Sequence, residues 1–314
     1  MDDPTRRALA PAQERTLEML RRGPEPIVFD PDAVDALTAT MTEALDHLAE
    51  RIAALGRDSL WINKSAIGSV LGCEVHHTRP DEFTWNVARA TGTVAHRAIE
   101  LLINWRGEPI PADLVDEAIA RLIAEPKSIG DWLAGITEAD RAELTGGAVD
   151  RVVKFTETFP PLDRRFAPVV ESSIRWPNDG PIVLAGKVDL VIGRPEGRES
   201  RKVIIDLKTG GAWPNHMDEL RFYALLETLR SGIPPRKVAS FYLDSGRAVA
   251  EDVTLDSLRA AVRRTLDAVG AEVELREGRP PELRPQASCN WCPLRPDCAE
   301  GTEWLRQRDE ERDR

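Results

Sequence analysis

The pattern of apolar and polar residues changes from a helical period to a strand period near residue 167. Before it, apolar positions three and four residues apart predict helices over residues 5–22, 30–56, 63–73 and 91–102, with further helices between 107 and 160. In the helix over 30–56, Asp30 can cap the start and Pro31 suits the first turn. Its apolar residues share one face as far as Gly56: Val34, Leu37, Met41, Leu45, Leu48, Ile52 and Leu55. We interpret these helices as scaffold.

The second half of the chain carries short β-branched and apolar runs that are typical of strands. They predict strands over residues 169–176, 182–192, 203–208, 238–243 and 248–253, the last at a sheet edge, with helices over 218–230 and 255–276. The resulting order of helix, three strands, helix and strand predicts an α/β fold. Its mixed central sheet would follow a large N-terminal helical elaboration.

Composition narrows the class of protein. The chain has 314 residues, 42% hydrophobic and 30% charged, which suits a globular protein with a sizeable core. It has no apolar stretch of membrane-spanning length, and Met1 to Pro4 opens no secretory signal, so we expect a cytoplasmic location and no membrane partner. The net charge of −11 argues against a non-specific polyanion binder, although a local groove can still be basic.

Candidate chemistry appears first in the strand over 203–208. Asp206 and Lys208 are two residues apart, so a strand would point both side chains to one side. Taken alone, this pair is better interpreted as a surface ion pair at a strand end, which is common and contributes little.

The preceding strand strengthens the case for a site. It is apolar around one acid, Asp189, and the turn-rich loop from Gly193 to Ser200 would close a hairpin with the next strand. An acid in an apolar strand costs free energy unless a cation meets it. Two such acids beside Lys208 therefore predict a divalent-cation site, and oxygen ligands of this kind suit Mg²⁺ or Mn²⁺. His96, on the helix over 91–102, is by itself more often structural than a ligand.

The four cysteines suggest a second metal site. Cys289, Cys292 and Cys298 form a compact loop, and Cys73 lies 216 residues before Cys289 as the natural fourth ligand. Four thiolates hold either Zn²⁺ or an iron–sulfur cluster. Zinc sites usually come as two paired knuckles, so the wide spacing favours a cluster that joins the C-terminal tail to the N-terminal helices.

In this order the motifs resemble those of the PD-(D/E)XK nuclease superfamily, and within it the RecB/AddB-type nuclease domains with a cysteine clasp. The resemblance covers roughly residues 60 to 305. It rests on Gly92-x₃-His96, Gly186-Lys187-Val188-Asp189, Asp206-Leu207-Lys208-Thr209-Gly210, Tyr223-Ala224, and the four cysteines.

The resemblance implies a role for each matching residue. His96, Asp189 and Asp206 would hold one or two divalent ions together with the backbone carbonyl of Leu207, and Lys208 would position the attacking water. Tyr223 would support the site from the following helix. The cysteines Cys73, Cys289, Cys292 and Cys298 would ligate a structural 4Fe-4S cluster.

Two further acids are candidate ligands. Glu171 is where such nucleases often carry a first-strand acid, and a surface role for it is about as plausible. Glu219 stands where related nucleases usually have glutamine, so it is either a further metal ligand or a source of repulsion toward the scissile phosphate.

These expectations divide the chain into three parts. Residues 1–60 form an N-terminal helical segment, and residues 61–285 form a restriction-endonuclease-like core with a helical insertion at about 107–160. Residues 286–314 form the cysteine clasp and charged tail, joined to the core through Cys73.

The expected function is that of a metal-dependent deoxyribonuclease, an exonuclease on single-stranded or end-bearing DNA. DNA would follow a basic surface such as Arg164-Arg165 or Arg263-Arg264, unless these pairs are only solvated charge. A helicase or another repair or defence protein is an expected partner. The alternatives are a catalytically weak DNA- or partner-binding subunit with the same fold, and a zinc-stapled regulatory protein.

Overall fold

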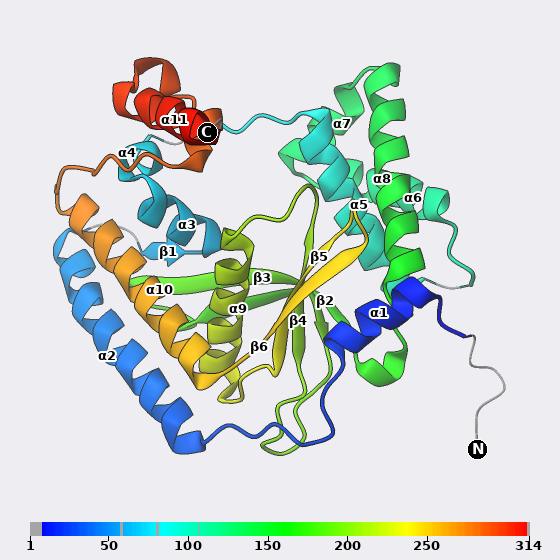
Figure 1. Ribbon diagram of the computed structural model, residues 1–314, viewed down its shortest axis with the longest axis horizontal. Helices are drawn as coiled ribbons and strands as arrows, with labels where there is room; N and C mark the ends of the chain where they lie inside the picture. The colour runs from blue at the N-terminus through cyan, green and yellow to red at the C-terminus, as the bar shows by residue number, and fades with distance from the viewer. Residues whose placement is uncertain (1–7, 57–58, 80–81, 106, 313–314) are drawn as a thin grey trace. The chain divides into compact units, whose positions relative to one another are not determined.

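The computed structural model describes residues 8–56, 59–79, 82–105 and 107–312, in two compact units (Figure 1). The first unit comprises residues up to Asp30, Thr84–Ile174 and Lys187–Thr254. The second comprises Pro31–Phe83, Arg175–Gly186 and the residues from Leu255 onward. The chain passes between the units within two strands, β2 (Val169–Trp176) and β3 (Ile182–Ile192).

The first unit is built on a mixed sheet. Its strands follow the order β3, β4 (Val203–Lys208), β5 (Lys237–Tyr242) and β6 (Arg247–Asp252), and β2 pairs with β3. β3 and β4 are antiparallel, as the predicted hairpin requires, whereas β4 and β5 are parallel. A parallel pair needs a crossover connection, here the helix α9 (Asn215–Ser231), which packs on β4 and β5. The predicted mixed sheet is therefore confirmed.

The helical region covers this sheet within the first unit. α5 (Val87–Asn104) packs against α6 (Pro111–Ala124) and α8 (Glu138–Thr158), and α7 (Ser128–Gly135) packs against α6 (Figure 1). One apolar core joins these helices to the sheet, and it includes Val94 and Ile99 of α5, Val152 of α8, and Ile205 and Phe241 of the strands. The helix α1 (Pro11–Leu20) packs on α8 and β6, and η1 (Arg164–Phe166) precedes β2.

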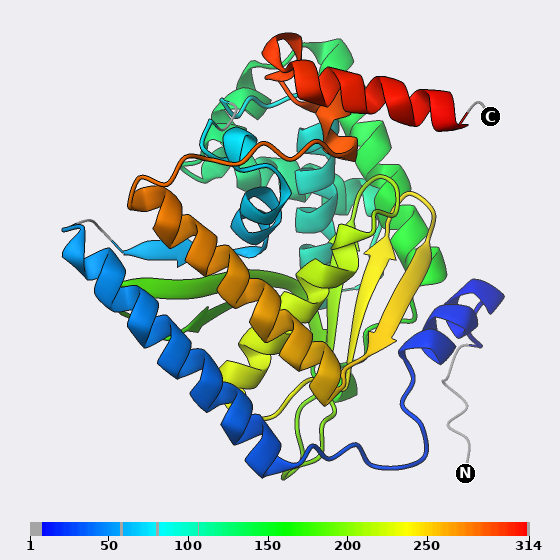
Figure 2. The same cartoon turned by 60° about the vertical axis from the view of Figure 1, so that its left-hand side comes forward.

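The second unit is mostly helical. α2 (Pro31–Ala54) and α10 (Leu255–Arg276) lie side by side in both ribbon views, and α10 also packs on α3 (Lys64–Gly72) (Figure 2). α4 (Glu74–His77) follows α3, and η2 (Ala287–Trp291), η3 (Arg295–Asp297) and α11 (Ala299–Arg312) close the chain. The short β1 (Leu60–Ile62) runs parallel to the beginning of β3, with Leu60 opposite Ile182.

The predicted elements are mostly found. α2 begins at Pro31 and buries the expected stripe, including Met41 and Ile52. The helix predicted over 5–22 is observed as α1, and residues 5–7 of that prediction lie outside the described residues. β1 was not predicted, because a three-residue strand is too short to show a period. Within the described ranges, no helix combines the length and hydropathy needed to cross a membrane.

Candidate active site and cysteine pocket

The end of β4 brings Asp206 and Lys208 together. The strand is buried, and only 2% of Asp206 is exposed. Lys208 Nζ lies 2.7 Å from Asp206 Oδ2, so the side chains share one side of the strand as expected. A buried carboxylate is costly without a cation, and the ammonium of Lys208 supplies the opposite charge beside Asp206.

Asp189 of β3 reaches the backbone between these two residues. Its Oδ2 accepts a hydrogen bond of 2.7 Å from Leu207 N. Its Oδ1 lies 3.6 Å from His96 Nδ1 on α5. The structure therefore places Asp189 next to two other predicted residues, Leu207 and His96. The predicted ligand atom of Leu207 is its carbonyl, whereas its observed contact with Asp189 is through the N–H.

The helix α9 contributes Glu219 and Tyr223, one turn apart. Glu219 Oε2 accepts a hydrogen bond of 2.6 Å from Lys208 Nζ, and Glu219 Oε1 accepts one of 3.3 Å from Asn215 Nδ2. Tyr223, 2% exposed, donates a hydrogen bond of 2.8 Å from its hydroxyl to Lys187 O on β3. Tyr223 is thus hydrogen-bonded to the strand that carries Asp189.

Glu171 lies in an unusual backbone conformation within β2. Its φ of +52° is in the left-handed region, which costs a non-glycine residue about 1–2 kcal/mol. Its carboxylate forms an ion pair with Lys187 Nζ. Backbone strain of this kind concentrates at functional sites, and it favours a role for Glu171 beyond that of a surface strand residue.

Some of these residues line one cleft in the first unit, whereas Asp206, Lys208, Glu219 and Tyr223 are not part of its lining. It has a volume of about 670 Å³, within the range of ligand-binding sites, and its lining includes His96, Asp189, Glu171 and Lys187. Gly92 also lines the cleft. It packs closely on the residue after β4, since a Cβ at Gly92 would lie 3.1 Å from Thr209 Oγ1. The Gly-x₃-His spacing therefore reflects close approach of α5 to the end of β4.

Part of the cleft comes from a region without a recognised signal. The segment from the end of α6 to the start of α7 contributes Leu122, Glu125, Lys127, Ser128 and Ile129 to the lining. Residues 107–160 carry no motif that indicates chemistry. Only the packing of α6 on α5 brings this segment to the site, so no local pattern could have identified it.

The four cysteines meet in the second unit. Cys73, Cys289, Cys292 and Cys298 carry free thiols and line one pocket of about 250 Å³. Burial raises the pKa of the Cys292 thiol, and the neighbouring cysteines add to this shift. The pocket is tightly packed, since a Cβ at Gly301 would lie 3.1 Å from Cys298 Sγ and 3.4 Å from Cys289 Sγ. The structure thus brings Cys73 to the three cysteines of the C-terminal loop.

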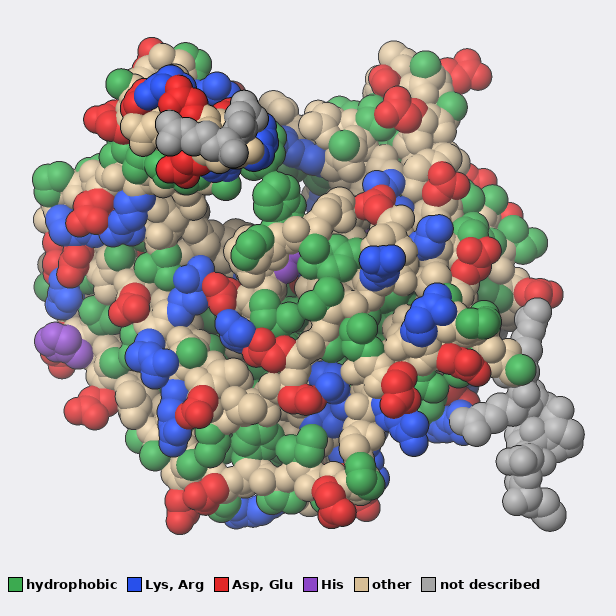
Figure 3. Space-filling view, viewed as in Figure 1, with side chains coloured by type: hydrophobic (Ala, Val, Ile, Leu, Met, Phe, Trp, Pro, Cys, Tyr) green, Lys and Arg blue, Asp and Glu red, His purple; other side chains and the backbone are tan. Residues whose placement is uncertain are grey.

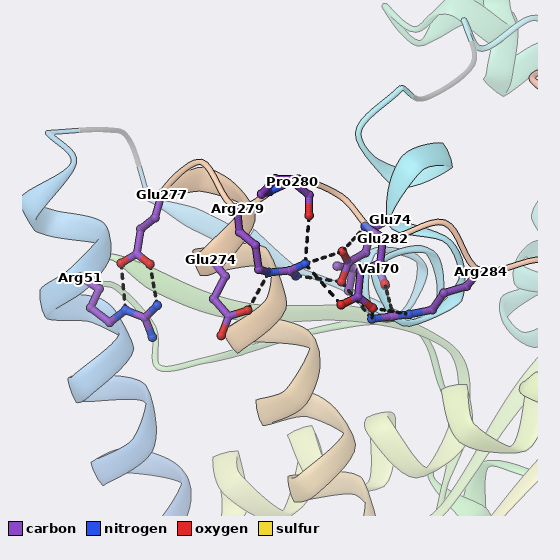
Figure 4. A network of polar contacts seen from close by, with 9 residues as sticks. All are labelled: Arg51, Val70, Glu74, Glu274, Glu277, Arg279, Pro280, Glu282 and Arg284. Carbon is purple, nitrogen blue, oxygen red and sulfur yellow. Dashed lines mark hydrogen bonds and ion pairs between the residues drawn. The ribbon is translucent and has the colours of Figure 1, made fainter.

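A polar network joins Glu74, the residue after Cys73, to the segment 279–284, which precedes the C-terminal cysteines (Figure 4). Glu74, next to Cys73, is fully buried, and both its oxygens accept hydrogen bonds of 2.9 Å from Arg279. Glu282 N donates to Glu74 Oε2 at 2.8 Å, and Arg284 lies 3.2 Å from Glu74 Oε1. The hydrogen bond from Arg279 is the main reason that the pKa of Glu74 falls to about 2. The sequence analysis did not single out this network.

Comparison with known proteins identifies the family. The model of the PD-(D/E)XK nuclease superfamily matches residues 71–299, a span that contains all of the matching motifs. The chain belongs to the PD-(D/E)XK nuclease superfamily. No protein with a curated description matches the chain.

Two solved structures are similar to this PD-(D/E)XK protein. One is described as "Putative exonuclease" from Eubacterium rectale, with 12% identity and a TM-score of 0.44, covering 71% of this chain and 84% of that one. The other is SSO0001, with 16% identity and a TM-score of 0.31, covering 67% of this chain and 96% of that one.

Family membership makes this PD-(D/E)XK protein a nuclease by class, and such nucleases generally use divalent metals such as Mg²⁺. The carboxylates of Asp189 and Asp206 and the imidazole of His96 are suitable donor types for such an ion. As the side chains stand, no three His, Cys, Asp or Glu residues among those described have an arrangement that could hold a metal ion. Lys208 is a counter-charge of Asp206, with its Nζ 2.7 Å from Asp206 Oδ2. The donor types of Asp189, Asp206 and His96 fit a divalent ion.

Basic and acidic side chains are interspersed on the face seen in Figure 3. Of the expected DNA surfaces, Arg165 pairs with Asp163 at 3.3 Å and stacks on Phe166, 4.9 Å from the ring centre. The cleft itself holds other basic residues, Arg89, Arg97, Lys127 and Lys187, which were not expected there.

Proposed function

We propose that this protein is a metal-dependent DNA nuclease of the RecB/AddB type, an exonuclease on single-stranded or end-bearing DNA. The observation that supports it best is the arrangement at the end of β4. Lys208 lies 2.7 Å from Asp206, and Asp189 accepts a hydrogen bond from Leu207, the residue between them. A structural ion pair alone needs no second acid or imidazole at the same strand end.

Each residue has a role in the proposed reaction. Asp189, Asp206, His96 and the Leu207 carbonyl would hold Mg²⁺ or Mn²⁺, with Glu171 as a further carboxylate. When bound, the metal would polarise the phosphate and lower the pKa of a bound water. Lys208 would orient that water and offset the phosphate charge, and Tyr223 would keep β3 in place.

The reaction itself is a hydrolysis. The water oxygen forms a bond to phosphorus, the ester bond to the leaving nucleotide breaks, and one proton of the water ends on the leaving oxygen. Lys208 would act through its charge and its position, because positioning and charge stabilisation provide most of the rate enhancement in phosphoryl transfer.

The test uses end-labelled single-stranded and double-stranded DNA with Mg²⁺, Mn²⁺ or a chelator. We expect cleavage with metal, none with chelator, and a loss of about 100-fold or more in Lys208→Ala, as for other charge-stabilising groups. Lys237→Ala is the matched control, because Lys237 pairs with Asp252 at the opposite end of the parallel strands. Wild-type cleavage by Lys208→Ala would refute this active site.

The second candidate is a catalytically weak DNA- or partner-binding subunit of a repair or defence complex, in which a helicase would be a fitting partner. One observation favours it: Lys208 lies between the carboxylates of Asp206 and Glu219, at 2.7 and 2.6 Å. An ammonium held by two acids is harder to displace. Binding of DNA without cleavage under any metal would support this candidate.

For the cysteine pocket we propose a structural 4Fe-4S cluster held by Cys73, Cys289, Cys292 and Cys298. The support is that all four thiols line one pocket. Zn²⁺ is the alternative occupant of a four-thiol site. The visible absorbance of anaerobically purified protein distinguishes the two, because zinc thiolates are colourless.

A further inference from the structure

Trp85 is held in a fixed position at one end of the cleft. Its indole Nε1 donates a hydrogen bond of 3.0 Å to Ser128 Oγ, on the first residue of α7. The ring also packs against the apolar core of the first unit and lines the cleft. A tryptophan fixed in this way presents an aromatic surface with little loss of conformational entropy on binding.

The cleft leads from Trp85 toward the proposed metal site along one face of α5. The lining residues Arg89, Thr93, His96 and Arg97 follow at helical spacing. His96 lies seven positions after Arg89, which corresponds to about 10 Å along a helix axis. An extended nucleic-acid strand with a phosphate near His96 could run along this face of α5 toward Trp85.

Charge alone does not make this cleft a strong phosphate site. Its lining holds equal numbers of cations and carboxylates: Arg89, Arg97, Lys127 and Lys187 against Glu100, Glu125, Glu171 and Asp189. Several are paired with one another: Arg97 contacts both Glu100 and Glu125, and Lys187 contacts Glu171. A nearly neutral cleft must bind nucleic acid largely through contacts other than counterion release.

We propose that Trp85, positioned by Ser128, is a base-stacking subsite that selects unpaired nucleotides of single-stranded DNA. This inference rests on the proposed nuclease function. The indole face can stack on any base whose own face is uncovered, and in a duplex the bases already stack on one another. In this proposal the α6–α7 segment contributes to substrate recognition, because Ser128 accepts the hydrogen bond that positions the Trp85 ring.

The experiment measures binding, so that it does not depend on cleavage. The full chain carries Asp206→Asn in chelator, and fluorescence anisotropy follows a short oligothymidylate, the same oligonucleotide with abasic sites, and a duplex. We expect Trp85→Ala to weaken single-strand binding roughly 5- to 100-fold, the range for loss of one base–aromatic stack. Trp85→Phe should keep most of the affinity, and Ser128→Ala should lose a smaller part.

Controls separate stacking from folding. Trp61→Ala removes a tryptophan that is 49% exposed and is not part of the cleft lining, and this variant should bind as wild type does. Wild type should prefer normal to abasic DNA, whereas Trp85→Ala should not. If Trp85→Ala unfolds, Trp85→Phe, Ser128→Ala and the abasic comparison still decide the matter.

The outcomes for the subsite and for the nuclease are distinct. Wild-type affinity in Trp85→Ala with an unchanged melting temperature, or an equal loss on duplex and single strand, would overturn the subsite. Absence of cleavage with any metal, together with Trp85-dependent single-strand binding, would refute the nuclease and leave the subsite standing. A steep salt dependence, with a logarithmic slope beyond about −3, would also contradict a stacking-dominated cleft.

Discussion

Lys208 Nζ lies 2.6 Å from Glu219 Oε2, and the two residues are eleven positions apart in the chain. The contact joins the end of β4 to the first turns of α9. Because the same ammonium lies 2.7 Å from Asp206, Glu219 competes with Asp206 for one positive charge. A glutamine at this position would not hold the ammonium by charge.

Glu219→Gln removes that competition. If Glu219 also joins a metal site, we expect the ratio of cleavage rates in Mn²⁺ and Mg²⁺ to change by about threefold or more, because ligand charge is part of metal choice. Rates across a titration of each metal provide the measurement. Asp218→Asn, on the same turn and paired with Arg221, is the control. An unchanged metal profile would place Glu219 outside the coordination sphere.

Glu171→Gly separates strain from function. Glycine adopts the left-handed backbone of this position without the penalty of a side chain, although it loses more entropy on folding. We expect the free energy of unfolding to rise by about 0.5 kcal/mol while cleavage falls, because the carboxylate at the cleft is lost. Denaturant melts and rate assays measure the two effects.

The control for Glu171 is Glu171→Gln, which keeps the strain and removes the charge. It should lower cleavage without gaining stability. Full activity in both variants would mean that Glu171 is only a surface residue of the strand.

Glu74→Gln tests the buried network. Removing the charge leaves Arg279 and Arg284 without their shared partner, so we expect a loss of about 3 kcal/mol in the free energy of unfolding at pH 7. Glu303→Gln is the control, because Glu303 pairs with Arg306 on exposed side chains. Such surface pairs contribute little. Urea unfolding of both variants gives the comparison.

The same network has a defined acid dependence. The pKa of Glu74 is about 2 in the folded protein against an ordinary value of 4.5. Its stabilisation is therefore complete above about pH 4.5 and is lost as the pH falls toward about 2. The difference in stability between wild type and Glu74→Gln should shrink over that window. A difference that stays constant from pH 7 to pH 3 would contradict the assigned shift.

Cys73→Ala tests the proposed cluster. A cluster between Cys73 and the C-terminal cysteines would close a loop of more than two hundred residues. Restricting the unfolded chain in this way contributes roughly 4–5 kcal/mol by analogy with a disulfide. We expect the variant to lose iron and to melt at a lower temperature, with activity falling through disorder. Metal analysis and thermal melts of wild type and variant measure both effects.

Two results would contradict the cluster or its fourth ligand. Stoichiometric zinc without iron in the wild-type protein would exclude the iron–sulfur cluster. Full iron and an unchanged melt in Cys73→Ala would exclude Cys73 as a ligand.

The sequence by itself determined the features that depend on neighbouring residues. Strand alternation placed Asp206 and Lys208 on one side of β4, and the turn-rich loop after β3 predicted the hairpin that brings Asp189 to them. These relations are local, because pleat and turn geometry are set over a few residues. They were sufficient to predict the mixed sheet and the acids at its centre.

Only the tertiary structure decided which distant residues meet these acids. Glu219 holds Lys208, Ser128 anchors Trp85, and Glu74 bonds with Arg279 across 205 positions. No periodic pattern predicts such pairs, because they depend on how helices pack and on the need of each buried charge for a partner. The local pattern thus predicted the acids of the site, and packing chose the residues that surround them.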